Sequence, residues 1–224
     1  MRAYVRECVL DCVIGTGEIA GMKTLVVAAQ KGGAGKTALS RNLAAVAAED
    51  GQRVLLIDLD PQGTTRRWLE RRQADEPTML DADPEPGEIP GVLARLNGHF
   101  DLVVIDTPPT VPAWMSDVMG SSDLVLIPAR ASTDDLDAIG ATIGAASRAG
   151  ASIAFVMTMI NPRAALTDAV ARALAQHGRV APVNIHSRVV YAEIGGSGES
   201  VVEARDPKAL EEMKRLWGYV QEVM

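Results

Sequence analysis

The chain has 224 residues, of which 47% are hydrophobic, and its formal net charge at pH 7 is -7. This length allows one large domain with a substantial buried core. The negative charge argues against a globally basic nucleic-acid-binding protein, although it leaves room for a local positive patch. No apolar run reaches the roughly 18 residues that cross a bilayer, so we expect a soluble, cytoplasmic protein.

Residues 1–21 precede the first expected strand and lack a signal-peptide layout, because Asp11 interrupts their apolar middle. Both cysteines, Cys8 and Cys12, lie in this stretch, and the absence of nearby Cys or His ligands argues against a zinc site. We expect residues 1–21 to be a dispensable extension, either disordered or preceding a true start at Met22. Residues 22–224 are expected to form a single domain.

Beyond this extension, short apolar runs alternate with segments of helical periodicity. The first run covers residues 24–29, and a helix is expected over 37–50. The pattern then repeats, with strands expected at 54–57, 102–105, 124–127 and 153–159 and helices at 64–72, 113–120, 134–148 and 165–177. Because parallel strands need crossover connections, this alternation predicts a doubly wound α/β fold, with a mostly parallel sheet and helices on both faces.

Two regions depart from this alternation. Residues 73–91 are rich in proline and acidic residues, which indicates a surface loop with one short strand at 78–80. The other is a C-terminal helix, expected to begin near Asp206 and to pack one apolar face on the core. That face comprises Leu210, Met213, Trp217 and Val220.

A glycine-rich loop, QKGGAGKT at residues 30–37, follows the first expected strand. It differs from the phosphate-binding motif G-x-x-x-x-G-K-[ST] at Gln30, and it carries an additional lysine, Lys31. Backbone N–H groups of such a loop and the N-terminus of the next helix bind phosphate, Lys36 holds the β- and γ-phosphates, and the Thr37 hydroxyl holds Mg²⁺. The predicted nucleotide contacts are Lys31, Gly32, Gly33, Ala34, Gly35, Lys36, Thr37 and Ala38.

Carboxylates follow two further expected strands, in IDLDPQG at residues 57–63 and IDTPP at 105–109. In open α/β sheets, ligands bind beyond the carboxyl ends of the strands. Asp106 therefore fits the Walker B carboxylate, which holds the metal, usually through water. Asp58 and Asp60 would share a face of an extended strand, but a turn at Pro61 leaves open whether both reach the site. Together with the loop, these residues predict binding of ATP and Mg²⁺.

The segments KGGAGKT, LLIDLDPQG and LVVIDTPP resemble the deviant Walker A, A′ and B motifs of the ParA/MinD family of dimerising P-loop ATPases. The resemblance runs from about Met22 to the C-terminus, where SRVVYAEIGGSGESVVEA is also similar to the short ParA-type partition ATPases. It implies that Lys31 reaches across a nucleotide-sandwich homodimer to the partner's ATP and acts like an arginine finger.

The resemblance also implies individual roles. Asp58 would position the attacking water and help to order the metal, Asp106 would bind Mg²⁺ through water, and Asn161 would contact the adenine. Lys31, Lys36 and Asp58 are thus the predicted catalytic residues. Residue 107 is Thr, so no glutamate follows Asp106 as a strong general base. We therefore expect slow hydrolysis that a ParB-like adaptor stimulates.

ParA-type proteins bind DNA nonspecifically as ATP dimers, which implies a role in plasmid or chromosome partition and association with the nucleoid. Basic and acidic residues balance after position 160, and Lys208 is expected to pair with Glu211 and Glu212 along a helix. The candidate DNA contacts are Arg188, Lys214 and Arg215.

Two alternatives remain open. A MinD-like protein would bind membrane through a basic C-terminal helix, but the tail EEMKRLWGYVQEVM has three acids and two bases, so no membrane partner is expected. An ATP-dependent biosynthetic enzyme on the same fold would have no need of Lys31 in a second subunit. The sequence does not name the cargo.

Overall fold

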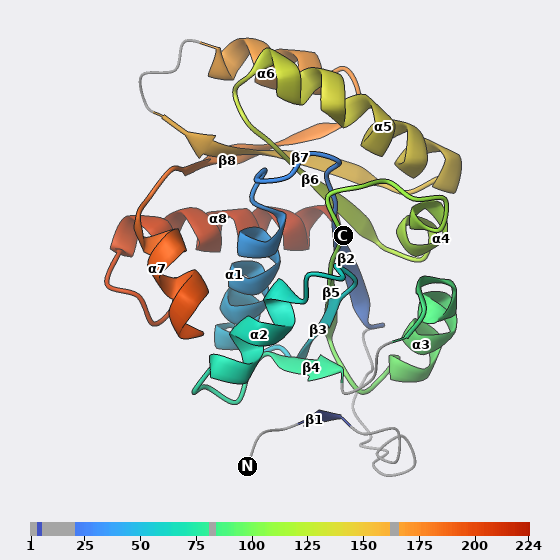
Figure 1. The fold of residues 1–224 in the computed structure, drawn as a ribbon, viewed down its shortest axis with the longest axis vertical. Coiled ribbons are helices and arrows are strands. Elements are labelled where there is room, and N and C mark those ends of the chain that lie inside the picture. Colours follow the sequence, from blue (N-terminus) through green and yellow to red (C-terminus); the bar gives the residue numbers. More distant parts are fainter. Residues whose placement is uncertain (1–3, 6–20, 81–83, 162–165) are drawn as a thin grey trace.

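A parallel sheet forms the centre of the computed structural model, which describes residues 4–5, 21–80, 84–161 and 166–224 (Figure 1). The strands are β1 (Tyr4–Val5), β2 (Lys23–Val27), β3 (Val54–Asp58), β4 (Thr78–Leu80), β5 (Leu102–Asp106), β6 (Leu124–Ala129), β7 (Ile153–Ile160) and β8 (Arg179–His186). They lie in the order β1-β4-β3-β5-β2-β6-β7-β8, and each neighbouring pair is parallel. The predicted doubly wound α/β fold is confirmed.

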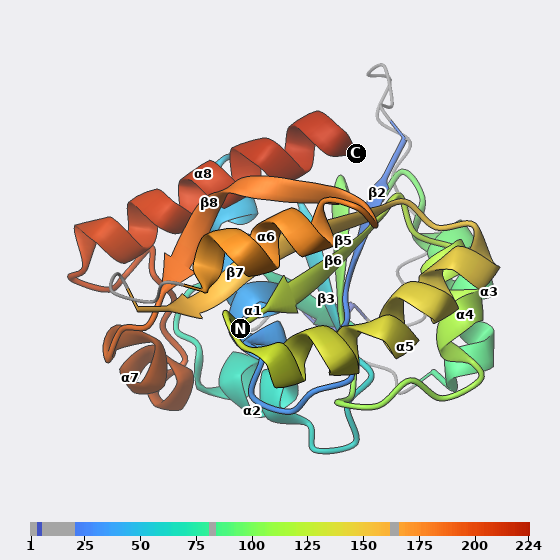
Figure 2. The same ribbon diagram turned by 90° about the horizontal axis from the view of Figure 1, so that it is seen from above.

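Helices cover both faces of this sheet, as the view from above shows (Figure 2). One face packs against α1 (Lys36–Glu49), α2 (Thr64–Arg71), α7 (Val190–Ser197) and α8 (Pro207–Val223). The other packs against α3 (Ile89–Leu96), α4 (Met115–Gly120), α5 (Thr133–Ala149) and α6 (Thr167–Leu174), and the short 3₁₀ turn η2 (Pro86–Glu88) precedes α3.

The central strand β2 shows why the strands of this sheet are continuous apolar runs in the sequence. Leu25 and Val27 lie in the cluster under α1 and α8, whereas Val26 lies in the cluster under α4 and α5. Successive side chains of a strand point to opposite faces, so a strand covered on both faces must be apolar at every position. The same alternation holds in β5, where Val104 and Val103 lie in different clusters.

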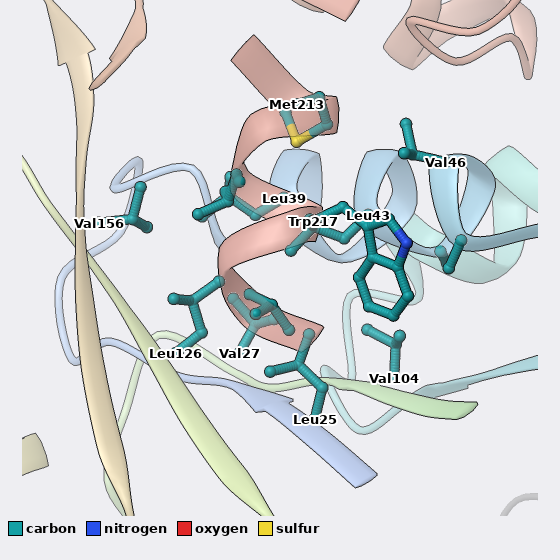
Figure 3. Packing of buried hydrophobic residues seen from close by; sticks show 14 of the residues in the cluster. Leu25, Val27, Leu39, Leu43, Val46, Val104, Leu126, Val156, Met213 and Trp217 are labelled. Carbon is teal, nitrogen blue, oxygen red and sulfur yellow. The ribbon is translucent and has the colours of Figure 1, made fainter. Parts of the chain in front are cut away.

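Helix α1 packs on the sheet and, along one side, against α8, so it is buried on more than one side (Figure 3). Leu39 and Leu43 of α1 pack in one cluster with Leu25 and Val27 of β2, and Trp217 of α8 lies in the same cluster near Leu43. Burying each of these large side chains contributes about 1.5–3 kcal/mol. The helix that begins at the glycine-rich loop is therefore held firmly by the core.

The C-terminal helix packs on the core as predicted, with a slightly rotated face. Its buried residues are Ala209, Met213, Leu216, Trp217 and Val220. Leu210 is only partly buried at the edge of the same cluster. Leu216 is fully buried and occupies the position that the sequence analysis had expected for Leu210.

Several elements were absent from the sequence prediction. The segment 73–91 contains the expected short strand, but η2 and the start of α3 also fall there, because Ile89, Val92 and Leu93 bury an apolar face that the local prolines and glycines obscured. Strand β8 is buried at alternate positions only, and α7 contains two glycines. The helix expected at 165–177 is shorter in the described residues, from Thr167 to Leu174.

At the N-terminus, Tyr4 and Val5 pair in parallel with Met79 and Leu80 of β4. The two cysteines lie outside the described residues.

The sheet order places the glycine-rich loop at a topological switch point. From β2 the chain first builds β3 and β4 on one side and later β6, β7 and β8 on the other. Beyond the carboxyl end of β2, the two halves diverge and leave a crevice in which α/β proteins bind ligands.

Candidate nucleotide-binding site

Two glycines shape the loop at residues 30–37. Gly33 has φ 72° and Gly35 has φ 95°, values that residues with a Cβ rarely adopt. Gly35 is the N-cap of α1, so its left-handed backbone turns the loop directly into the first helical turn. The loop therefore presents backbone N–H groups and a helix N-terminus to the same space, which is the arrangement that binds phosphate.

Two buried threonines hold the loop and the end of β2 in place. Neither of them was identified as an anchor from the sequence. Thr158 of β7 donates from Oγ1 to the carbonyl of Ala34 at 2.9 Å. Thr107 donates from Oγ1 to the carbonyl of Val27 at 2.8 Å and is fully buried. The hydroxyl of Thr107 thus supports the end of β2. Thr158 lies within β7 and Thr107 directly follows β5, and this placement was the sequence signal for each role.

Lys36 begins α1 and is 6% exposed. Its Nζ donates to the carbonyl of Lys31 at 3.4 Å, so the loop closes on itself. Burial lowers the pKa of this amine, while the charges of Asp106 and Asp60 act in the opposite direction. A buried cation at the mouth of a loop of N–H donors is suited to bind phosphate oxygens.

Asp58 and Asp106 are direct neighbours across β3 and β5. Asp106 is fully buried and accepts hydrogen bonds from Thr65 Oγ1 at 2.7 Å and Ser40 Oγ at 3.3 Å. Burial raises the pKa of Asp106 to about 6, against the hydrogen bonds from Thr65 and Thr37, and the charge of Asp58 raises it further. The two carboxylates therefore repel each other in a poorly solvated place.

Asp58 and Asp60 diverge at the turn. Asp58 accepts from the backbone N–H groups of Asp60 and Arg66, each at 3.0 Å, and burial raises its pKa. Asp60 Oδ1 instead accepts from the backbone N–H of Gln62 at 2.9 Å, in its own loop. Of the two aspartates, Asp58 is the one placed beside Asp106.

Mg²⁺ fits this donor set. The Thr37 hydroxyl and the two carboxylates offer hard oxygen ligands, and Mg²⁺ keeps several waters and takes phosphate oxygens rather than a complete protein cage. Among the described residues, no group of three or more His, Cys, Asp or Glu side chains could hold a metal ion. A buried carboxylate whose pKa is raised is also stabilised by a nearby cation.

The Lys31 side chain forms an ion pair with α5. Its side chain is 31% exposed, and its Nζ lies 3.4 Å from Oδ1 of Asp135, which is only 4% exposed. Arg130 Nε at 3.0 Å and Ser132 Oγ also bind Asp135. Although burial acts in the opposite direction, these partners hold the pKa of this carboxyl below its usual value. Asp135 was not identified from the sequence.

The start of the loop also contacts α5 through its backbone. The backbone N–H of Gln30 donates to Thr142 of α5 at 3.2 Å.

An apolar pocket opens beside the loop, between the ends of β7 and β8. Met159 marks its rim, with φ 52° and an irregular β7–β8 register around it. The lining residues are Gly35, Ala38, Leu39, Thr158, Met159, Ile185, His186, Ser187, Arg188, Tyr191 and Met213. Such a surface is suited to a planar ring next to the phosphate loop. Asn161 is exposed just beyond β7, and its contact with adenine stays a prediction.

Arg188, one of the predicted DNA contacts, is not freely available in this structure. Its guanidinium pairs with Glu212 of α8 and lies 3.9 Å from Asp206, and its side chain is 20% exposed. Glu212 also accepts from His186 Nδ1 at 2.8 Å. The carboxylate of Glu212 thus contacts residues at the end of β8. The sequence had instead predicted that it would pair with Lys208.

The other two candidates are exposed residues of α8. Lys214 Nζ pairs with Glu49 of α1 at 2.9 Å, and both side chains are substantially exposed. Arg215 is exposed and lines a groove between β8 and α8, together with Lys208 and Arg188. The lining of this groove thus holds three basic side chains, Arg188, Lys208 and Arg215, and two acidic ones, Glu211 and Glu212.

A glycine-rich loop at the switch point of a parallel sheet, with a buried lysine and neighbouring strand-end carboxylates, defines a P-loop nucleotide-binding protein. Residues 25–201 match the CobQ/CobB/MinD/ParA nucleotide binding domain, and the chain belongs to this family. It is 32% identical over 206 residues to the maintenance of carboxysome distribution protein A of Halothiobacillus neapolitanus, covering 86% of this chain and 94% of the relative. It is 28% identical over 193 residues to the chromosome-partitioning ATPase Soj of Thermus thermophilus, covering 70% and 78%.

Solved structures share the fold. Apo McdA from Cyanothece has a TM-score of 0.72 at 24% identity, covering 90% of this chain and 99% of that one. Cobyrinic acid a,c-diamide synthase from Mycobacterium smegmatis, solved with ADP and magnesium, has a TM-score of 0.68 at 20% identity, covering 90% and 94%. The fold is therefore common to positioning proteins and to a biosynthetic enzyme.

Proposed function

We propose that this protein is an ATP-dependent dimerising switch ATPase that partitions or positions a cellular cargo. The observation that carries the proposal is Lys31, a second lysine in the phosphate loop whose side chain pairs with Asp135 of α5. A lysine that its own phosphate site does not use is available to a second subunit. Relatives named for carboxysome distribution and for chromosome partitioning support the same class of function.

The residues divide the work of hydrolysis. Lys36 and the loop N–H groups bind the phosphates, and Asp58 orients the attacking water in line with the γ-phosphate. Lys31 of one subunit stabilises the negative charge on the transferred phosphoryl group in the other. Thr37 and Asp106, with help from Asp58, would hold Mg²⁺, which would supply positive charge to stabilise the phosphates during transfer. Residue 107 is a threonine, whose hydroxyl donates to the carbonyl of Val27, so no strong general base follows Asp106. Hydrolysis is therefore slow and requires an adaptor protein like ParB for stimulation.

Nonspecific DNA is the proposed surface on which the ATP dimer assembles, which would place the protein on the nucleoid. The groove between β8 and α8 supplies the exposed Arg215 and Lys208, whereas Arg188 is held by Glu212, and dimerisation doubles these charges. The exposed side of α8 carries both Glu222 and Lys214, so this helix differs from a strongly basic membrane-binding helix.

A biosynthetic ATP-dependent enzyme is the second candidate, because the cobyrinic acid a,c-diamide synthase shares the fold. Such an enzyme keeps the same oligomeric state with and without ATP. A switch ATPase changes from monomer to dimer.

Light scattering with and without ATP and Mg²⁺, on the wild type and on Lys31→Ala and Lys36→Ala, tests the proposal. We expect the wild type to dimerise only with ATP, and Lys31→Ala to bind a fluorescent ATP analogue but to remain monomeric. Lys36→Ala should lose nucleotide binding, and Lys208→Ala, an exposed lysine outside the loop, should match the wild type. A Lys31→Ala protein that dimerises and hydrolyses ATP normally would refute the proposal.

A further inference from the structure

An arginine is buried behind the paired carboxylates of the nucleotide site. Arg41 lies on α1, on the turn after Lys36, and is 6% exposed. Its guanidinium stacks over the ring of Trp68, with the carbon at 5.7 Å from the ring centroid. Its Nη2 is buried and has no hydrogen-bond partner among the described residues. Burying a charge is costly unless it is compensated, so its position calls for a partner of opposite sign.

Arg41 is connected to Asp106 through one hydroxyl. Arg41 Nε donates to Thr65 Oγ1 at 3.4 Å, and Thr65 Oγ1 donates to Asp106 Oδ2 at 2.7 Å. A threonine hydroxyl has a single proton. Because its oxygen accepts from the guanidinium, that proton is directed to the carboxylate.

This connection orients the carboxylate of Asp106. Oδ2 is engaged by Thr65 of α2, whereas Oδ1 faces Ser40 on the first turns of α1, at 3.3 Å. The oxygen on the loop's side is thereby presented toward the helix that carries Thr37. Side chains that orient a metal-binding carboxylate affect metal affinity without touching the metal.

The charge of Arg41 also favours this arrangement of the carboxylates. The charges of Asp106 and Asp58 oppose the effect of burial on Arg41, whose pKa burial lowers to about 10. The guanidinium therefore stays protonated at neutral pH, and it supplies positive charge behind two carboxylates that repel each other.

We propose that Arg41 and Thr65 are positioning residues that hold the Asp106 carboxylate for Mg²⁺ and so set the Mg²⁺ requirement of nucleotide binding. The inference rests on the proposed function, because it assumes that this site binds a Mg²⁺–nucleotide. It goes beyond that function by assigning two residues outside the loop and strand-end motifs.

The test is a titration of Mg²⁺ at a fixed concentration of a fluorescent ATP analogue. Thr65→Val keeps the shape of the side chain but removes the hydroxyl, and Thr65→Ser restores the hydroxyl. We expect Thr65→Val to raise the Mg²⁺ concentration at half-saturation by about 10-fold or more, the effect typical of residues that orient metal ligands, and Thr65→Ser to stay within about 2-fold of the wild type. Nucleotide affinity in EDTA should be the same in all three proteins.

Arg41→Met should shift the Mg²⁺ midpoint in the same direction, and the double variant with Thr65→Val should shift it no further, because both changes break one chain of hydrogen bonds. Arg72→Met is the matched control: Arg72 stacks on Trp68 at 5.0 Å but pairs with Glu203. It should lower thermal stability without moving the Mg²⁺ midpoint.

The outcomes separate the inference from the proposed function. A wild type whose nucleotide binding depends on Mg²⁺, with an unchanged midpoint in both Thr65→Val and Arg41→Met, would overturn the positioning role alone. Additive shifts in the double variant would also overturn it. A wild type that binds the analogue without any Mg²⁺ dependence would overturn the Mg²⁺ site on which the inference rests. Thr65→Ala replaces Thr65→Val if the latter fails to fold.

Discussion

Asp106 illustrates at the scale of one residue how function opposes stability. Its carboxylate is fully buried beside Asp58, and burial raises its pKa to about 6 from an unfolded value of 3.8. Ionised Asp106 therefore destabilises the nucleotide-free fold above about pH 6, and the effect disappears below the unfolded pKa, where the group is protonated in both states.

We therefore expect Asp106→Asn to raise the free energy of unfolding of the nucleotide-free protein by about 1–3 kcal/mol near pH 7.5. The advantage over the wild type should shrink as the pH falls toward about 4.5. Urea unfolding of both proteins at the two pH values measures this difference. The same variant should lose Mg²⁺-dependent nucleotide binding, and a variant less stable than the wild type at the higher pH would contradict the account.

The ion pair between Lys31 and Asp135 is a second feature at this scale. Asp135 keeps its contacts with Arg130 and Ser132 when Lys31 leaves, so release of Lys31 does not strand a buried charge. A partly exposed pair of this kind contributes about 0.5–1 kcal/mol. Lys31 is therefore held in place but can be released at small cost.

Asp135→Asn should increase the rate at which acetic anhydride modifies Lys31 in the nucleotide-free protein. The expected factor is about two- to five-fold, which corresponds to the energy of a partly exposed ion pair. Mass spectrometry of the modified peptides gives the rate, with the exposed Lys208 as internal reference. Equal rates in the variant and the wild type would show that the pair does not protect the amine.

At the scale of elements, α8 completes the core that holds the phosphate loop. Met213, Leu216 and Trp217 bury one face of α8 beside α1, and Trp217 Nε1 donates to Asp50 at 3.2 Å just beyond the end of α1. Since α1 begins at the loop, loss of packing under α8 loosens the helix on which the loop depends.

Leu216→Ala should lower the free energy of unfolding by about 2–5 kcal/mol, because it removes a fully buried side chain and leaves a cavity. Lys214→Ala, on the exposed side of the same helix, should change it by less than about 0.5 kcal/mol. Chemical denaturation measures both. Similar effects for the two variants would mean that α8 does not dock through this face.

At the scale of the whole molecule, a net charge of -7 makes any DNA contact local. Arg215 is exposed, whereas Arg188 is held by Glu212, so the two candidates differ in availability. Glu212 also binds His186, which lines the apolar pocket. The carboxylate of Glu212 therefore connects the pocket to the groove between β8 and α8.

Under the proposed function, Arg215→Gln should weaken DNA retention with ATP and reduce the slope of affinity against salt by about one. Glu212→Gln should strengthen retention, because it releases Arg188. Arg53→Gln, which removes a pair with Asp101 at the opposite end of the sheet, is the control. DNA pelleting over a series of salt concentrations measures all three, and unchanged retention in Arg215→Gln would exclude this groove.

Within the described part of the chain, no helix is both long enough and apolar enough to cross a membrane.

The sequence by itself determined the alternation of strands and helices, the glycine-rich loop and the carboxylate at the end of β5, because these features follow from local periodicity and motif spacing. Strand β8, α3 and α7 escaped prediction, since their burial depends on neighbours distant in sequence. Only the tertiary structure placed Asp135 on Lys31, Glu212 on Arg188, and Arg41 with Thr65 behind Asp106. The physical reason is that hydrogen bonds and ion pairs join atoms that are close in space, and the sheet order decides which strand ends and helices meet.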